Sequence, residues 1–304
     1  MAQEQLKDGD VMSAIVLVKT VTKSVAKNGS DYLKLEINDG HQDWPAFVWD
    51  TSIYDFKEGE MVKLKGELGS FKGKPKITVI SASPTTDVIK LPTLTKVEIQ
   101  NYIKRFNTLR DLVTDEDFKA IFEYTFDNES LWENFIKAPA AKGNHQAYLG
   151  GLIQHSVEVA ELSNQMYLTE TAGINRSLLI TGALLHDIGK TKEYIYDTTI
   201  DRSTSGKLIG HTSLAVMIIS WLVPNDFNKK KLVELIHLIL AHHGKRDWGA
   251  PVEPMMKEAM IIHHADMINC YGSRFNEIKE KSQIKEWSEF DTTYNRSWYL
   301  HSTV

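Results

Sequence analysis

The chain has 304 residues, of which 42% are hydrophobic and 25% are charged, a composition that is typical of folded proteins and excludes a largely disordered chain. This length predicts two domains, each large enough to bury a core. The net charge of -5 excludes a protein that coats nucleic acid through bulk electrostatic attraction, so a binding site for a polyanion must be local.

Cys270 is the only cysteine, which excludes an internal disulfide framework and favours a reducing compartment. The opening stretch, MAQEQLKDGD, is polar, and the longest apolar run, LAVMIISWLV, is too short to cross a bilayer. We therefore expect a cytoplasmic protein that does not contact membranes.

Alternating hydrophobic residues run through the chain to about residue 83 and predict five strands. In DYLKLEIND, Leu33, Leu35 and Ile37 alternate with polar neighbours, which is typical of a half-buried strand. Similar runs, separated by turn-rich segments, are SAIVLV, WPAFVWD, MVKLKGEL and KITVISAS. Between the third and fourth runs, TSIYDFKEGE has room for one helical turn. Residues 1–83 therefore suit a closed Greek-key barrel of the OB type, with a sandwich fragment as the competing fold.

Pro84 and Pro92 mark residues 84–94 as a linker, and from about residue 95 the apolar residues recur with helical spacing. This pattern predicts an all-α domain over residues 95–304, with its core at about 140–280.

Histidines concentrate in the predicted helical domain. Nine of the eleven lie between His145 and His264. His155 lies on the apolar stripe of GGLIQHSVEVAELSNQM, between Leu152 and Val159 at helical spacing. This register predicts that His155 faces the core.

Five further ionisable groups continue apolar faces of predicted helices. His186 and Asp187 follow two apolar rows of RSLLITGALL, so both are expected to point inward. Asp266 interrupts the apolar face of PMMKEAMIIHHADMINC. His242 and His243 each extend the stripe of KKLVELIHLILAHHGK, and the register does not separate them.

A carboxylate on an apolar face needs a cation, an ion-pair partner or a proton. Two inward Asp side chains among several inward His are most simply explained by divalent metal, because neutral imidazole and carboxylate are the usual ligands of Zn, Mn and Fe. A satisfied core histidine is an equal alternative for any single position. It accounts poorly for inward histidines on several helices at once.

The order His155, His186-Asp187, Asp266 resembles the HD superfamily of metal-dependent phosphohydrolases. GHT at 210–212 and AHHG at 241–244 resemble the additional histidines of its two-metal members. Because an OB-type domain precedes the stretch GNHQAYLGGLIQHS, the chain is similar to the YhaM-type 3′-5′ exoribonucleases over almost its full length. The resemblance implies a multidomain fold: an N-terminal all-β OB-type barrel followed by an all-α HD-domain helical bundle.

The resemblance also implies two divalent ions, with Mn²⁺ favoured and Fe or Co as alternatives. The expected ligands of the first ion are His155, His186, Asp187 and Asp266. The second is expected to share Asp187 as a bridge and to add His211 with His242 or His243. His211 precedes Thr212 and Ser213, which predict a helix cap, and a helix N-terminus favours a neutral imidazole. A surface histidine beside a cap is the alternative for His211.

Bound metal explains why the sequence offers no obvious nucleophile, because a metal lowers the pKa of its water from about 15.7 toward roughly 7. Asp187 is then the catalytic bridging ligand. Lys190 is a second catalytic candidate that contacts the phosphate or protonates the leaving oxygen. Its equal alternative is a solvated lysine at a helix end.

Aromatic and basic residues of the predicted barrel suggest a surface that binds single strands by stacking, at about 1–3 kcal/mol per base. The candidates for RNA contact in the barrel are Tyr32, Lys34, Phe47, Lys72 and Lys74. His145 and Tyr148, in the stretch before the first helix ligand, are further candidates.

The favoured function is a metal-dependent 3′-5′ exoribonuclease that releases nucleoside monophosphates from single-stranded RNA, with single-stranded DNA as another possible substrate. An HD phosphohydrolase or phosphodiesterase acting on free or cyclic nucleotides is one alternative, and a non-catalytic RNA-binding protein with a structural metal is another. For the aromatic segment EWSEFDTTYNRSWYLH we expect packing on the helical bundle. The alternatives are that it closes a homo-oligomer or borders the path of the RNA.

Overall fold

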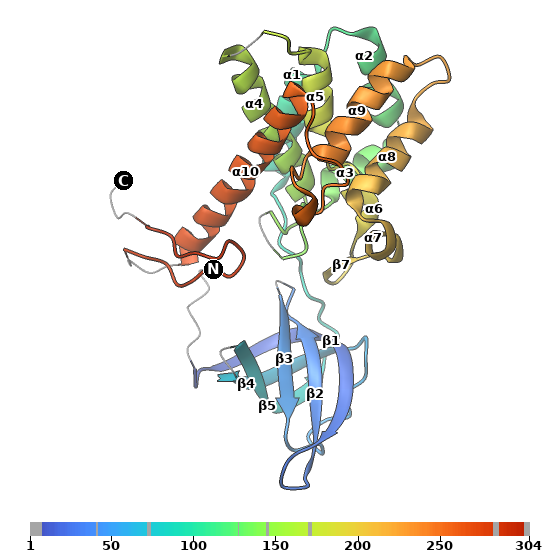
Figure 1. Ribbon diagram of the computed structural model, residues 1–304. Coiled ribbons are helices and arrows are strands. Elements are labelled where there is room, and N and C mark those ends of the chain that lie inside the picture. The colour runs from blue at the N-terminus through green and yellow to red at the C-terminus, as the bar shows by residue number, and fades with distance from the viewer. Residues whose placement is uncertain are drawn as a thin grey trace. The chain divides into compact units, whose positions relative to one another are not determined.

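The computed structural model describes residues 8–40, 42–71, 74–126, 128–143, 146–169, 172–281 and 286–300. The chain divides into two compact units, Met1–Pro92 with Asp197–Ile200, and Thr93–Tyr196 with Asp201–Val304 (Figure 1). The first unit holds the predicted strands and the second holds the predicted helices.

Within the described residues, five strands close the first unit into a barrel with the order β1-β2-β3-β5-β4. The strands are β1 (Val11–Val25), β2 (Asp31–Asn38), β3 (Asp43–Val48), β4 (Met61–Phe71) and β5 (Lys74–Pro84). β1 pairs with β2 through one half and with β4 through the other, and β3 pairs with β5 in parallel. The OB-type prediction is confirmed and the sandwich alternative is wrong, because closure leaves no open edge at β1 or β4.

The predicted strand register is confirmed. Leu33, Leu35 and Ile37 face the barrel core, whereas Lys34 is exposed. Residues 51–60, which have room for one helical turn, consist instead of turns and irregular backbone. Asp50 explains the start of this segment, because the carboxylate accepts hydrogen bonds from the backbone and hydroxyl of Ser52 and so competes with helical bonding.

The second unit consists mainly of helices. They are α1 (Lys96–Arg110), α2 (Glu116–Phe126), α3 (Glu129–Lys137), α4 (Gly151–Thr169), α5 (Arg176–Leu185), α6 (Lys190–Glu193), α7 (Thr204–Ile209), α8 (His211–Leu222), α9 (Lys229–Ala241) and α10 (Lys257–Lys281), with a 3-10 turn at Arg246–Trp248. α4 packs against α1, α5 and α10, and α9 packs against α5, α8 and α10. Apolar faces of these helices form one continuous core.

Short β structure interrupts the helical unit, so the expectation of a purely α domain needs correction. β6 (Tyr194–Tyr196) and β7 (Ile200–Arg202) form a two-stranded sheet. β6 has the sequence Tyr-Ile-Tyr, and aromatic and β-branched residues favour extended backbone. No helix within the described ranges has the length and apolarity needed to cross a membrane.

Candidate metal centre

The inward-facing His and Asp side chains predicted from helical register meet inside the helical unit. His155 lies in α4, the His186-Asp187 doublet follows α5, and Asp266 lies in α10. His155, His186 and Asp187 are buried, and each offers a ligand atom within 4.8 Å of those of the others. A second group with the same spacing contains His186, His242 and Asp266. The doublet and the distant Asp therefore share one centre.

The two oxygens of the Asp187 carboxylate face different pairs of histidines. Oδ2 lies 3.2 Å from Nε2 of His155 and 3.3 Å from Nε2 of His186. Oδ1 lies 3.5 Å from Nε2 of His211 and 3.6 Å from Nε2 of His242. Asp266 completes the first side, with Oδ1 3.3 Å from Nε2 of His155. One carboxylate thus stands between two sets of nitrogen donors.

Hydrogen bonds fix which ring nitrogen of these histidines carries the proton. Nδ1 of His186 lies 2.8 Å from the Ala183 carbonyl, and Nδ1 of His242 lies 2.6 Å from the Ile239 carbonyl. A carbonyl only accepts, so Nδ1 donates in both rings and the neutral rings present a bare Nε2 to the centre. This is the tautomer that binds a metal through Nε2.

The centre has a buried oxygen that lacks a hydrogen-bond partner among the described residues. Nε2 of His155 and Nε2 of His186 are 3.2 Å apart. Oδ1 of Asp187 is buried and accepts no hydrogen bond. Imidazole nitrogens and carboxylate oxygens are the ligands of Zn, Mn and Fe. Divalent cations therefore fit this donor set.

The charges around Asp187 keep its carboxylate ionised. Burial alone would raise the pKa of Asp187, but the Lys190 ammonium, 2.6 Å from Oδ2, lowers it well below its ordinary range. Burial lowers the pKa of His242 well below its ordinary value, and burial together with His211 lowers the pKa of His243 to about 4. His242 and His243 are thus neutral near pH 7, the form that ligates metal.

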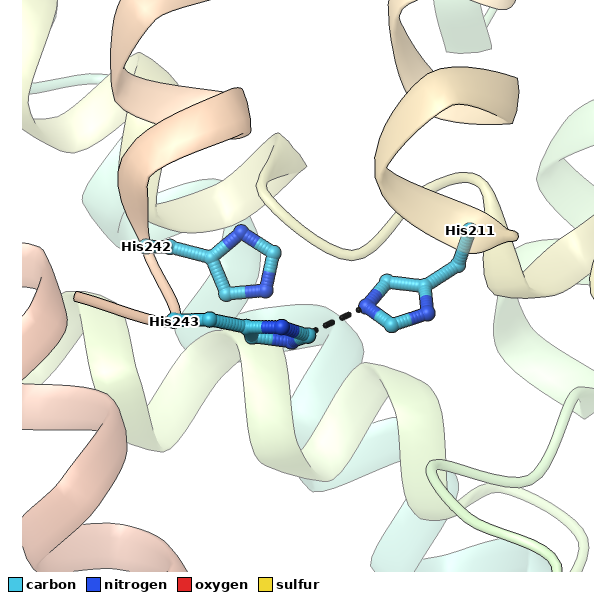
Figure 2. A group of neighbouring side chains, drawn as sticks. All are labelled: His211, His242 and His243. Atoms are coloured by element: carbon cyan, nitrogen blue, oxygen red, sulfur yellow. Dashed lines mark hydrogen bonds between the residues drawn. The ribbon is translucent and has the colours of Figure 1, made fainter. Parts of the chain in front are cut away.

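The structure distinguishes the two neighbouring histidines that register left unresolved. Figure 2 shows His242 and His243 opposite His211, with a contact of 3.2 Å between Nε2 of His211 and Nε2 of His243. His242 is buried and faces Asp187, whereas His243 is half-buried. Ligand atoms of all three histidines lie within 4.8 Å of one another.

Two local expectations need correction. Lys190 is only 8% exposed, and Nζ lies 2.6 Å from Oδ2 of Asp187, so the reading as a solvated helix-end lysine is wrong. The buried carboxylate attracts the ammonium inward. His211 is the first residue of α8, and its cap is Gly210 with φ +78°, not Thr212 or Ser213. The positive φ favours glycine at that point.

Comparison with known proteins agrees with this geometry. Residues 152–269 match the HD domain family. A protein named 3′-5′ exoribonuclease YhaM, from Halalkalibacterium halodurans, is 30% identical over 312 residues, which cover 96% of this chain and 93% of the relative.

The chain belongs to the YhaM family.

Further relatives with the same name come from Geobacillus sp. and Bacillus subtilis. The first is 29% identical over 301 residues, covering 96% of this chain and 92% of the relative. The second is 28% identical over 305 residues, covering 96% and 95%. The HD domain of this YhaM-family chain implies dependence on divalent metal.

Two side chains that contact Nδ1 of the expected ligand histidines were not predicted from the sequence. Oε2 of Glu193 is 3.0 Å from Nδ1 of His211, and its side chain is only 2% exposed. Oδ1 of Asn269 is 2.8 Å from Nδ1 of His155, and the Asn269 amide donates to Glu158 at 2.7 Å. Asn269 lies three residues after Asp266 on the same helix face, a signal present in the sequence. Glu193 had no such signal, because its burial depends on the chain beyond it.

The barrel carries the predicted aromatic pair on its outer surface. The rings of Tyr32 and Phe47 stack with centroids 6.2 Å apart, and Tyr32 also stacks on Trp49 at 4.8 Å. Trp49 is 50% exposed and was not among the predicted contacts. Nζ of Lys76 lies 5.7 Å from the centre of the Phe47 ring.

The other predicted RNA contacts differ in their surroundings. Lys34 is exposed in β2 and lies opposite Phe47 of β3. Tyr148 is half-buried, and its hydroxyl donates to Gln154 at 2.8 Å. Lys72, His145 and the side chain of Lys74 lie outside the described residues.

Proposed function

We propose that this chain is a metal-dependent 3′-5′ exoribonuclease that hydrolyses single-stranded RNA and releases nucleoside monophosphates. The observation that carries the proposal is the Asp187 carboxylate, whose two oxygens face separate pairs of imidazole Nε2 atoms. Membership of the YhaM family supports the same activity. The relatives are named 3′-5′ exoribonucleases, which supports both the direction and the RNA substrate.

Two divalent ions, with Mn²⁺ favoured, would be held on the two sides of Asp187. His155, His186, Asp187 and Asp266 would hold the first. His211 and His242, with His243 beside them, would hold the second together with Asp187. When bound, two such cations acidify water and neutralise developing charge on a phosphoryl group.

The protein's own groups prepare this site for a phosphodiester. Nζ of Lys190 lies 2.6 Å from Oδ2 of Asp187 and directs one N–H toward it. The ammonium has two further N–H donors, which we assign to phosphoryl oxygens of the substrate. Asn269 and Glu193 hold the His155 and His211 rings in the orientation that presents Nε2. Apolar side chains of the core exclude water around the ligands, which strengthens every charge interaction within the site.

The barrel would retain the RNA strand. Tyr32, Phe47 and Trp49 offer a row of stacked rings, and Lys34 and Lys76 bring positive charge to it. Aromatic rings with local basic residues bind single strands largely without regard to sequence. The same chemistry accepts single-stranded DNA, because a ring stacks on the bases of either strand.

The proposal is tested with 5′-labelled single-stranded RNA, mononucleotides and a cyclic dinucleotide, each incubated with the full chain and Mn²⁺. A ladder that shortens from the 3′ end, with release of nucleoside monophosphates, is the expected result. The Asp187→Asn chain is the matched control and should leave the RNA intact. Hydrolysis of the small nucleotides alone, or bound metal without turnover of any substrate, would contradict the proposal.

A further inference from the structure

The segment 286–300 follows the part of the chain that matches the HD domain and packs beside α10 (Figure 1). Backbone bridges between Trp287 and Tyr299 and between Asp291 and Arg296 fold it back on itself. The buried Asp291 carboxylate fixes it to α10, because Arg274 donates to both oxygens at 3.2 and 3.0 Å. The segment therefore has a defined place against the helix that carries Asp266.

This segment presents an arginine stacked on aromatic rings. The rings of Tyr294 and Tyr271 are 4.3 Å apart and tilted by 33°. The guanidinium of Arg296 lies 5.5 Å from the centres of both the Tyr271 and Trp298 rings. Arg296 is itself exposed, and its Nε donates to the Tyr294 carbonyl at 3.1 Å. The charge is thus held in place while its remaining donors face solvent.

The aromatic cluster is connected to the metal centre through consecutive residues of α10. Tyr271 directly follows Cys270, whose thiol donates to Oδ1 of Asp266 at 3.3 Å. Ligand atoms of Cys270, Asp266 and His155 lie within 4.8 Å of one another. Tyr294 packs on Tyr271, so it lies against the residue that directly follows Cys270 in α10.

We propose that Tyr294 and Arg296 form the seat of the 3′-terminal nucleotide, with the base stacked on Tyr294 and a backbone phosphate on Arg296. This inference rests on the proposed exoribonuclease function and names the residues that hold its substrate. Aromatic rings stack on any base, and a guanidinium pairs with phosphate through two parallel donors. A seat beside Asp266 would place the last phosphodiester at the metal ligands and explain attack from the 3′ end.

The test compares two RNA strands that differ only in whether the 3′-terminal ribose carries a base. Stacking of one base contributes about 5- to 150-fold to affinity, so wild type should bind the complete strand more tightly by a factor in that range. Tyr294→Ala should lose this preference while binding the abasic strand as wild type does. Tyr294→Phe keeps the ring and should keep the preference.

Binding is measured by fluorescence anisotropy in EDTA, and KM and kcat are measured with Mn²⁺. Trp287→Ala, in the same segment, is the control and should change neither. Arg296→Ala should weaken both strands alike and reduce the slope of log affinity against log salt by about 1. Tyr294→Leu, which retains apolar packing on Tyr271, covers the case in which Tyr294→Ala fails to fold.

The inference is wrong if Tyr294→Ala and Tyr294→Leu retain the preference for a terminal base, or weaken both strands equally. The proposed function fails separately, if wild type does not shorten RNA at all, because the binding arm needs no turnover.

Discussion

Replacing Glu193 by Gln tests how the second side of the metal centre is built. The carboxylate lies 3.0 Å from Nδ1 of His211 and is buried, with Arg202 3.4 Å from its other oxygen. Gln retains the size of the side chain but removes the charge. It can also turn its amide NH₂ toward Nδ1, which would reverse the tautomer and place the proton on Nε2.

The size of the effect follows from this contact. A hydrogen bond to a charged group contributes about 1.5–3 kcal/mol and a neutral one about 1 kcal/mol. The difference, about 0.5–2 kcal/mol, corresponds to about 2- to 30-fold weaker metal binding. We expect this loss for one of two Mn²⁺ ions, because His155 and His186 do not contact Glu193.

Calorimetric titration of metal-free protein with Mn²⁺ measures both binding steps, and thermal unfolding checks that the variant folds. Glu258→Gln is the control, since Glu258 is a buried Glu whose carboxylate accepts from the Asn175 backbone at 2.6 Å, outside the metal centre. Unchanged affinity for both ions in Glu193→Gln would refute the assigned role. So would an equal loss in Glu258→Gln.

Three further substitutions test other parts of the account. Asp187→Asn removes the charge between the two donor sets, so metal analysis should find both ions depleted and RNA turnover should fall to background. Retention of either ion at wild-type affinity would count against a bridging carboxylate. Tyr32→Ala removes one ring from the barrel row and should weaken binding of long single-stranded RNA by about 5- to 150-fold with little change in kcat, which an anisotropy titration would contradict by showing equal affinities. Gly244→Ala forces an alanine to φ +79° and places Cβ 2.2 Å from the His263 ring, so its unfolding free energy should fall by more than the about 1–2 kcal/mol that a left-handed backbone costs. Gly173→Ala, with φ +68° and no atom within 4 Å of the added Cβ, should show the backbone cost alone, and equal losses in denaturant titrations would argue against the His263 contact.

Periodicity alone predicted the barrel strands and the inward direction of the doublet. Leu33, Leu35 and Ile37 occupy every second position because one face of the strand points to the barrel core. This pattern can be recognised from the strand's own residues. His186 and Asp187 were found in the same way, as polar residues in apolar rows. Both signals are local.

Features that depend on distant segments were not predictable from the sequence. The register does not separate His242 from His243, and only the folded structure shows that His242 faces Asp187 while His243 contacts His211. Lys190 points inward because its ammonium pairs with the buried Asp187 carboxylate. Most lysines point to solvent instead. Glu193 is buried because Gly206 lets the chain pass close by: a Cβ there would lie 2.4 Å from the Glu193 carbonyl.

The central claim is that one carboxylate separates two metal ions, and anomalous diffraction at the manganese edge tests it most directly. Crystals grown with Mn²⁺ should show one peak beside Oδ2 of Asp187, near His155 and His186, and another beside Oδ1, near His211 and His242. Peaks that leave both Asp187 oxygens uncoordinated, or no peak at the centre in protein that hydrolyses RNA with Mn²⁺, would contradict the account.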